Sequence, residues 1–270
     1  MFSRNNHYFM STATRGDLRL HYELEGPADA PVLVMSNSLG TTLAMWDPQM
    51  PVLRQHFRVL RYDTRGHGAS SVSAEPFGMA ELGADVLAVM DHAGVQRAHF
   101  CGLSMGGMTG MWLARHHPDR FGRFVLANTA ALIGPASGWN TRIETVQRDG
   151  MAAIVEGVLA RWFTPAWLAG DPARIAPVRA MLEQADGSGY IANCAAVRDA
   201  DLRELLPAIE AEVLVIAGLQ DAATTPEQGR AVADAMPRAA YLSLDAAHLS
   251  NWELPGEFAD AVTAFLQRSR

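Results

Sequence analysis

Short apolar runs that alternate with longer segments of helical spacing constrain the fold of this 270-residue chain more than any other feature. The runs at 32–35, 59–62, 99–101, 124–127, 213–217 and 241–244 are almost continuously apolar, which is typical of strands covered by helices on both faces of a sheet. Apolar residues recur at helical spacing in 79–93, 105–117, 226–236 and 255–267. This alternation predicts an α/β fold with a mostly parallel, doubly wound sheet.

Two local signals add detail to this sheet. The segment 18–24 alternates apolar with polar residues, and the glycine at Gly16 precedes it. We therefore expect an antiparallel hairpin ahead of the parallel strands. Thr225, Pro226 and Gln228 have the pattern of a capping box with proline at the first helical position, which predicts a helix that begins at Pro226.

The alternation of strands and helices stops between about Gly134 and Leu206. Apolar residues in this stretch keep helical spacing without a strand-like run, and half of the six tryptophans fall here. We expect residues 134–205 to form a helical cap inserted into an α/β core made of residues 1–133 and 206–270. A lid over a pocket explains the clustered tryptophans better than ordinary helix packing does.

Composition limits the partners of the chain. The formal net charge of −7 argues against nucleic acid and membrane surfaces, which attract basic faces; an anionic substrate would need a local cationic pocket. The chain has two cysteines and no CxxC or His/Cys cluster, so we expect neither a disulfide framework nor a metal site. Without a membrane-length apolar run or the apolar core of a signal peptide, we expect a cytoplasmic protein. A homo-oligomer is compatible with the sequence.

A glycine-flanked serine follows the run that ends at Cys101. Gly102-Leu103-Ser104-Met105-Gly106 lies between a strand and a helix, which is the G-x-S-x-G pattern of a nucleophile elbow. The serine of such an elbow has a strained backbone, so its neighbours two residues away must be very small. We predict that Ser104 is a catalytic nucleophile rather than an incidental serine in a glycine turn.

A catalytic serine needs a base, and the base needs a group that orients it. Of the nine histidines, His248 and His67 follow strands, at the edge where doubly wound sheets place their chemistry. His67 lies in the sequence Arg-Gly-His-Gly, which favours a structural turn. We predict His248 as the base and His67 as a packing residue.

The orienting acid is expected after the penultimate strand, because elbow serines are followed in the chain by Asp and then His. Asp221 lies there, three residues after Gly218. Asp63 precedes the serine and fits a role in fixing its own loop, and Asp245 fits a simple turn. We therefore predict Asp221 as the acid.

Two backbone amides are expected to bind the oxyanion. One comes from the loop after the first parallel strand, Ser36-Asn37-Ser38-Leu39-Gly40, and the other from the residue after the nucleophile. We predict the N–H groups of Leu39 and Met105 as these donors. One such donor is commonly worth about 3–4 kcal/mol in the transition state.

With these residues placed, the chain resembles the α/β-hydrolase superfamily, and in detail the bacterial 3-oxoadipate enol-lactonases. The resemblance runs from about Tyr22 to the C-terminus and is carried by SNSLG at 36–40, MWDPQ at 45–49, YDTRGHG at 62–68, GLSMGG at 102–107, NTAA at 128–131, RWFTP at 161–165 and GYIANC at 189–194. It implies hydrolysis of 3-oxoadipate enol-lactone to 3-oxoadipate in the β-ketoadipate route, without a metal or organic cofactor.

One departure from this resemblance concerns the substrate. Enol-lactonases of this type often carry a basic residue shortly after the NTAA string, where this chain has Leu132. If that cation holds the free carboxylate of the substrate, Arg142 and Arg161 of the cap are its candidate replacements, with the indole N–H of Trp139 as a further donor. A surface or interhelical charge is the competing interpretation of each arginine. We expect a pocket lined by Leu132, Trp139, Arg142 and Arg161.

Two other functions fit the same residues. A carboxylesterase or lactonase that acts on a different small ester would use the same triad, and Leu132 mildly favours this alternative. A hydrolase-fold binding protein without activity would usually lack a member of the triad, whereas the order Ser, Asp, His is complete here.

Overall fold

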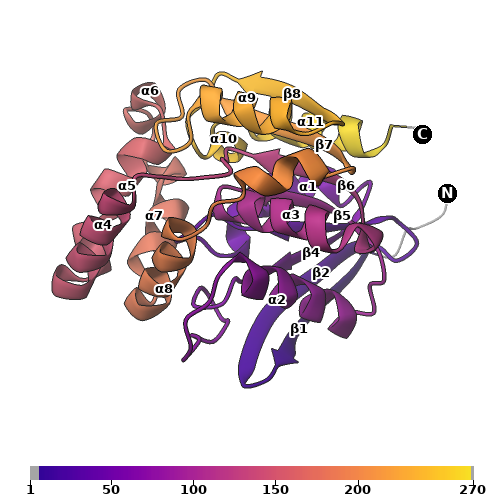
Figure 1. Ribbon diagram of the computed structural model, residues 1–270, viewed down its shortest axis with the longest axis horizontal. Coiled ribbons are helices and arrows are strands. Elements are labelled where there is room, and N and C mark those ends of the chain that lie inside the picture. The colour runs from indigo at the N-terminus through magenta and orange to yellow at the C-terminus, as the bar shows by residue number, and fades with distance from the viewer. Residues whose placement is uncertain (1–5, 269–270) are drawn as a thin grey trace.

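The computed structural model describes residues 6–268, in which one eight-stranded sheet has helices on both faces (Figure 1). Residues 1–5 and 269–270 lie outside the described residues. The prediction about a signal peptide rests partly on residues 1–5. The strands are β1 (Asn6–Arg15), β2 (Leu18–Pro27), β3 (Val32–Ser36), β4 (Arg58–Tyr62), β5 (Ala98–Leu103), β6 (Phe121–Ala127), β7 (Glu212–Gly218) and β8 (Ala239–Leu244).

The order of the strands is β1-β2-β4-β3-β5-β6-β7-β8. Strands β3 to β8 run parallel, while β2 pairs antiparallel with both β1 and β4. The predicted hairpin is confirmed, with Gly16 at its turn in the left-handed region (φ +58°), where glycine carries no steric penalty. The predicted α/β class and mostly parallel sheet are also confirmed.

Helices cover the two faces of the sheet separately. On one face lie α2 (Met79–His92), α3 (Met105–His116) and α9 (Pro226–Ala235); on the other lie α1 (Met50–Leu53), α10 (Ser250–Glu253) and α11 (Pro255–Leu266). Successive strand residues therefore enter different cores, as Val34 and Leu33 do. This two-sided burial is why the strands are continuously apolar in sequence.

The predicted helix boundaries agree closely with the structure. The capping box at the start of α9 forms as expected: Thr225 Oγ1 accepts from the Gln228 amide, and Gln228 Oε1 accepts from the Thr225 amide. The sequence did not predict α1 or the 3₁₀ helix η1 (Leu43–Gln49) before it. None of the described helices is long and apolar enough to cross a membrane.

The chain between β6 and β7 is helical. It forms α4 (Ala136–Asp149), α5 (Val155–Trp162), α6 (Pro165–Leu168), α7 (Ala176–Glu183) and α8 (Gly187–Arg198), which lie together beside the sheet (Figure 1). The 3₁₀ turn η5 (Arg203–Ala208) then leads back to β7. The helical character expected for 134–205 is therefore present, and the strands resume after it as expected.

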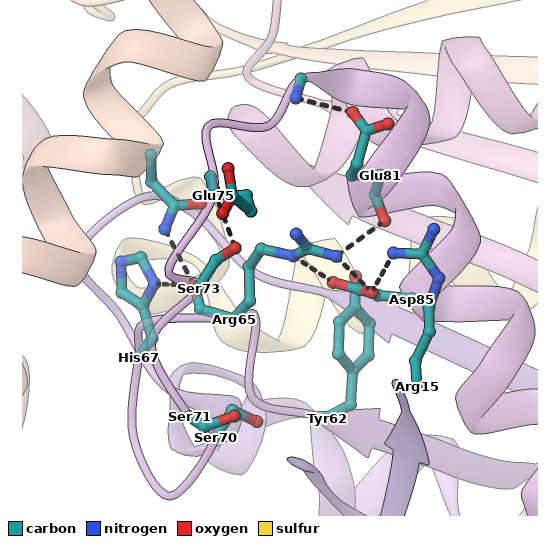
Figure 2. A network of polar contacts seen from close by, with 12 residues as sticks. Arg15, Tyr62, Arg65, His67, Ser70, Ser71, Ser73, Glu75, Glu81 and Asp85 are labelled. Atoms are coloured by element: carbon teal, nitrogen blue, oxygen red, sulfur yellow. Dashed lines mark hydrogen bonds and ion pairs between the residues drawn. The ribbon is translucent and has the colours of Figure 1, made fainter. Parts of the chain in front are cut away.

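A buried ion pair fixes the turn that follows β4. The guanidinium of Arg65 donates two hydrogen bonds of 2.6 Å to Asp85 on α2, and both side chains are almost fully buried. Arg15, at the end of β1, adds a third bond of 3.2 Å to the same carboxylate (Figure 2). The pair thus connects the hairpin, the turn after β4 and α2.

The substitution Arg65→Met tests how much this buried pair matters. It leaves the buried carboxylate of Asp85 with the half-exposed Arg15 alone, so we expect a loss of about 3–5 kcal/mol in the free energy of unfolding. Urea unfolding followed by circular dichroism measures this loss. The matched control is Arg148→Met, which removes a solvent-exposed pair with Asp149 and should leave the midpoint unchanged. Equal midpoints for the two variants would contradict the assignment.

Candidate active site

The predicted elbow has the expected backbone. Strand β5 ends at Leu103, α3 begins at Met105, and Ser104 between them has φ +57°. A Cβ atom added to Gly102 would lie 2.2 Å from the carbonyl oxygen of Gly106, and one added to Gly106 would lie 2.2 Å from that of Ser36. Both positions therefore require glycine, which holds the serine in this strained turn.

His248 and Asp221 form a buried hydrogen-bonded pair. His248 follows β8, Asp221 follows β7, and Nδ1 of the histidine lies 2.8 Å from Oδ2 of the aspartate. Ser104 and His248 line the same cavity, and Asp221 is not among its lining residues. Because Nδ1 is engaged with the carboxylate, Nε2 is the ring nitrogen left for a proton from Ser104.

The carboxylate of Asp221 has several donors besides His248. Its Oδ1 accepts from the amides of Ala223 and Thr224, and its Oδ2 accepts from Thr224 Oγ1 and Asn128 Nδ2 at 2.9 and 3.1 Å. Burial raises the pKa of this carboxyl, but the charge of His248 and these hydrogen bonds outweigh it, so the pKa stays below its usual value. The group is therefore ionised at neutral pH and fixed in orientation.

Asn128 is a site residue that the sequence did not single out. It has φ +45°, its Nδ2 also donates to the carbonyl of Ala247 at 3.1 Å, and its Oδ1 accepts from Ser250 Oγ at 2.6 Å. It thus joins the end of β6 to the carboxylate and to the loop that carries His248. The sequence does offer a signal for it: Asn128 is a polar residue directly after β6, at the edge of the sheet that carries Ser104.

The competing acids have other contacts. Asp63 accepts hydrogen bonds from the amides of Leu43 and Ala69, at 2.8 and 2.9 Å, and so fixes two loops. Burial raises the pKa of its carboxyl. Asp245 is exposed and accepts from Gln220 Nε2 at 2.9 Å. Of the three acids, Asp221 is the one in contact with His248.

Two free backbone donors lie beside Ser104. Leu39 and Met105 both line the cavity, and among residues 6–268 neither amide has a hydrogen-bond acceptor. The neighbouring amides are engaged: that of Gly40 donates to His67 Nε2, and that of Gly106 donates to the carbonyl of Asn37. The arrangement leaves two N–H groups available to an oxyanion.

The cavity lies between the sheet and the helices that follow β6, and its volume is about 670 Å³. The edge of the sheet contributes Ser104, His248 and the loop at Leu39, while α4 and α5 contribute cationic and aromatic side chains. No aspartate or glutamate is among the lining residues in the described part of the chain. The pocket is therefore locally cationic in a protein of net charge −7.

Arg142 and Arg161 supply this positive charge. Within residues 6–268, neither guanidinium has a carboxylate at ion-pair distance. Arg142 donates a long bond of 3.5 Å to the hydroxyl of Tyr190 and lies 4.9 Å from the ring centroid of Trp139. Burial and then the charge of Arg142 lower the pKa of Arg161. Two neighbouring cations without a counter-ion form a site suited to an anion.

Two expectations for the pocket are wrong in detail. Trp139 lines the cavity, but its indole N–H donates to the carbonyl of Ile133 at 2.6 Å, so it is not available to a substrate. Leu132 is not among the lining residues; Ile133 takes that place, while the carbonyl of Leu132 faces Gln228 of α9. This segment is neither strand nor helix, so no periodicity reveals which side chain points inward.

Fold and site together define a member of the α/β-hydrolase family: the family model described as alpha/beta hydrolase fold matches residues 31–255. The chain is 42% identical to 3-oxoadipate enol-lactonase 2 of Acinetobacter baylyi over 97% of its own length and 98% of that protein's. It is 45% identical to the enol-lactonase of Burkholderia xenovorans, with a TM-score of 0.94, over 96% of this chain and 100% of that one. A thermophilic esterase of Thermogutta terrifontis, solved with malate bound, is 28% identical, with a TM-score of 0.88 over 97% and 98% of the two chains.

The contact between Asn128 and Asp221 predicts a change in pH dependence. Asn128→Asp replaces the amide donor by a second carboxylate beside the histidine–aspartate pair. Added negative charge favours the imidazolium form, so we expect the acid limb of the kcat/KM profile to move up by roughly 0.5–1 pH unit. Asn128→Gly tolerates the positive φ and adds no charge, so it should lower the rate without moving the limb. An unmoved limb in Asn128→Asp would refute this role.

Proposed function

We propose that this protein hydrolyses 3-oxoadipate enol-lactone to 3-oxoadipate, with Ser104 as nucleophile. The observation that carries the proposal is the pair Arg142 and Arg161, which has no carboxylate counter-ion among residues 6–268, in the cavity that Ser104 and His248 also line. The substrate carries one free carboxylate beside its lactone ring, which matches a cationic pocket next to an acylation site. The two enol-lactonases to which the chain is similar over almost its full length support the same reaction.

Acylation begins at Ser104. Its Oγ attacks the lactone carbonyl carbon, and Nε2 of His248 takes the hydroxyl proton. Asp221 holds Nδ1 and stabilises the imidazolium that forms. The negative charge that develops on the carbonyl oxygen is bound by the free N–H groups of Leu39 and Met105, which lose no partner in doing so.

Collapse of this intermediate breaks the ring C–O bond. The leaving group is an enolate, which is a better leaving group than an alkoxide, and it takes up the proton held by His248 and becomes the ketone. The acyl chain remains bound to Ser104 as an ester. Water that loses a proton to His248 attacks this ester, and the second tetrahedral intermediate releases 3-oxoadipate and restores the serine.

The two parts of the chain have separate tasks in this scheme. Residues 1–133 and 206–270 form the core that performs acyl transfer, and residues 134–205 form a cap that binds the carboxylate. Trp139 contributes by stacking under the guanidinium of Arg142 rather than by donating its N–H. The aromatic ring holds the cation near the pocket without neutralising it.

Rates on a charged and an uncharged substrate test the proposal. We would follow loss of the ultraviolet absorbance of the enol-lactone, generated enzymatically in situ, and release of nitrophenol from p-nitrophenyl acetate. Wild type should accelerate the first reaction, and Ser104→Ala should lower the rate by about 10⁴ or more. Arg142→Met with Arg161→Met should raise KM for the lactone by about 10-fold or more and leave the uncharged ester within about 3-fold.

Arg179→Met is the matched control, because Arg179 lies on α7 and pairs with Glu156 at the surface. This substitution should change the kinetics on neither substrate. Wild-type protein that cleaves the aryl ester and leaves the enol-lactone untouched would overturn the proposed substrate. The chain would then be a carboxylesterase or lactonase for a different small ester. Equal losses on both substrates in the arginine variants would contradict carboxylate binding by this pair.

A further inference from the structure

The loop that carries Leu39 has its amides almost fully engaged. Ser38 N donates to Met45 Sδ, Gly40 N to His67 Nε2, Thr41 N to Ser38 O, and Leu43 N to Asp63 Oδ1. Leu39 lies within this series, and its N–H has no acceptor in the part of the chain that the structure describes. The next amide along the chain, that of Gly40, donates a buried hydrogen bond of 2.9 Å to His67, which lies in a different turn. The orientation of the Leu39 amide is therefore fixed by the contacts of its neighbours.

The surroundings of His67 make its Nε2 a hydrogen-bond acceptor for the Gly40 N–H. Its side chain is buried, and its Nδ1 lies 3.3 Å from the carbonyl of Arg65. Since Gly40 donates to Nε2, the ring carries its proton on Nδ1 and donates that to Arg65. Burial lowers the pKa of His67 to about 4, so the ring is neutral at neutral pH and Nε2 stays an acceptor.

The turn that carries His67 is itself clamped from two sides. On one side the guanidinium of Arg65 binds Asp85 of α2, pointing away from His67 (Figure 2). On the other side Asn193 of α8 donates from Nδ2 to the carbonyl of Arg65 at 2.8 Å. A Cβ atom on Gly189 of α8 would lie 2.2 Å from the carbonyl oxygen of Gly66. The turn therefore has little freedom to move.

Helices α7 and α8 also touch the loop directly. Gly40 has φ +83°, and a Cβ atom there would lie 2.8 Å from Leu182 Cδ2 and 3.0 Å from Tyr190 Cε2. The loop is thus held between the His67 turn and these two helices. Contacts from outside the loop, above all the bond to His67, therefore help to fix the N–H of Leu39.

We infer that His67 is a positioning residue for the oxyanion site: by accepting the Gly40 N–H it fixes the Leu39–Gly40 peptide, and through Leu39 it orients the adjoining Ser38–Leu39 peptide, whose N–H faces the developing oxyanion. Asn193 supports this geometry through the carbonyl of Arg65, so the helix α8 acts on the same donor. His67 is not among the described residues that line the cavity, so we expect its effect in the chemical step rather than in substrate binding. The inference rests on the oxyanion role proposed for Leu39 and is independent of which ester is the natural substrate.

Removal of the acceptor should reduce turnover more than binding. His67→Leu leaves the Gly40 N–H buried without a partner, which favours rotation of the neighbouring peptides. Complete loss of one oxyanion donor commonly costs about 10²–10³ in kcat. We expect a partial loss of about 10–100-fold in kcat, with KM within about 3-fold. His67→Gln can place Oε1 near the position of Nε2 and should retain kcat within about 5-fold.

His99→Leu is the matched control. His99 is also a histidine whose pKa burial lowers to about 4, and its Nδ1 also accepts a backbone N–H, that of Arg123 at 3.1 Å. It lies at the start of β5, at the opposite end of the strand from Ser104. Its loss should lower the melting temperature and leave kcat unchanged.

The test measures kcat, KM and melting temperature of the full-length variants on p-nitrophenyl acetate and on the enol-lactone. A fall in kcat on both esters for His67→Leu, rescued by His67→Gln and absent in His99→Leu, is the expected result. Use of the uncharged ester separates this outcome from failure of the proposed substrate. Unchanged kcat in a folded His67→Leu protein overturns the inference. If that variant does not fold, Asn193→Leu replaces it. Unchanged kcat in Asn193→Leu, or a folded His67→Gln protein whose kcat falls as far as expected for His67→Leu, would equally overturn the inference.

Discussion

The chemistry proposed for this site depends on a carboxylate held ionised in the interior of the protein. Desolvation opposes the charge of Asp221, and the opposing free energy is offset by donors from Ala223, Thr224, Asn128 and His248. These donors come from the segments after β6, β7 and β8. A parallel sheet brings three such strand ends together at one edge. The architecture of the sheet therefore places these donors around the carboxylate.

The other half of the site shows the reverse arrangement. Arg142 and Arg161 lie at the cavity wall without carboxylate partners in the described part of the chain, although the protein as a whole is acidic. Burial and then repulsion by the neighbouring Arg142 lower the pKa of Arg161. A bound carboxylate would offset both the cost of burying the charge and the repulsion. The pocket thus has unfavourable electrostatics of its own that an anionic substrate can correct.

Much of this organisation could be predicted from the sequence, for identifiable reasons. The strands β3 to β8 are buried on both faces and therefore show as apolar runs, and the elbow shows because Gly102 and Gly106 have no sterically acceptable replacement. Contacts between distant segments left no such signal. The bond from Asn128 to Ala247 spans 119 positions, and that from Gly40 to His67 spans 27. The sequence predicts His67 as a packing residue, because the local pattern indicates a turn but does not show which distant group the side chain of that turn binds.

Covalent labelling tests the central claim, that Ser104 is activated by the His248–Asp221 pair, most directly. The protein would be treated with a fluorophosphonate, its intact mass recorded over time, and the modified peptide sequenced. The account predicts a single adduct on Ser104, no adduct on Ser104→Ala, and much slower labelling in Asp221→Asn and His248→Ala than in wild type. An adduct on another residue, or labelling of Ser104 at the wild-type rate in the Asp221 and His248 variants, would contradict it.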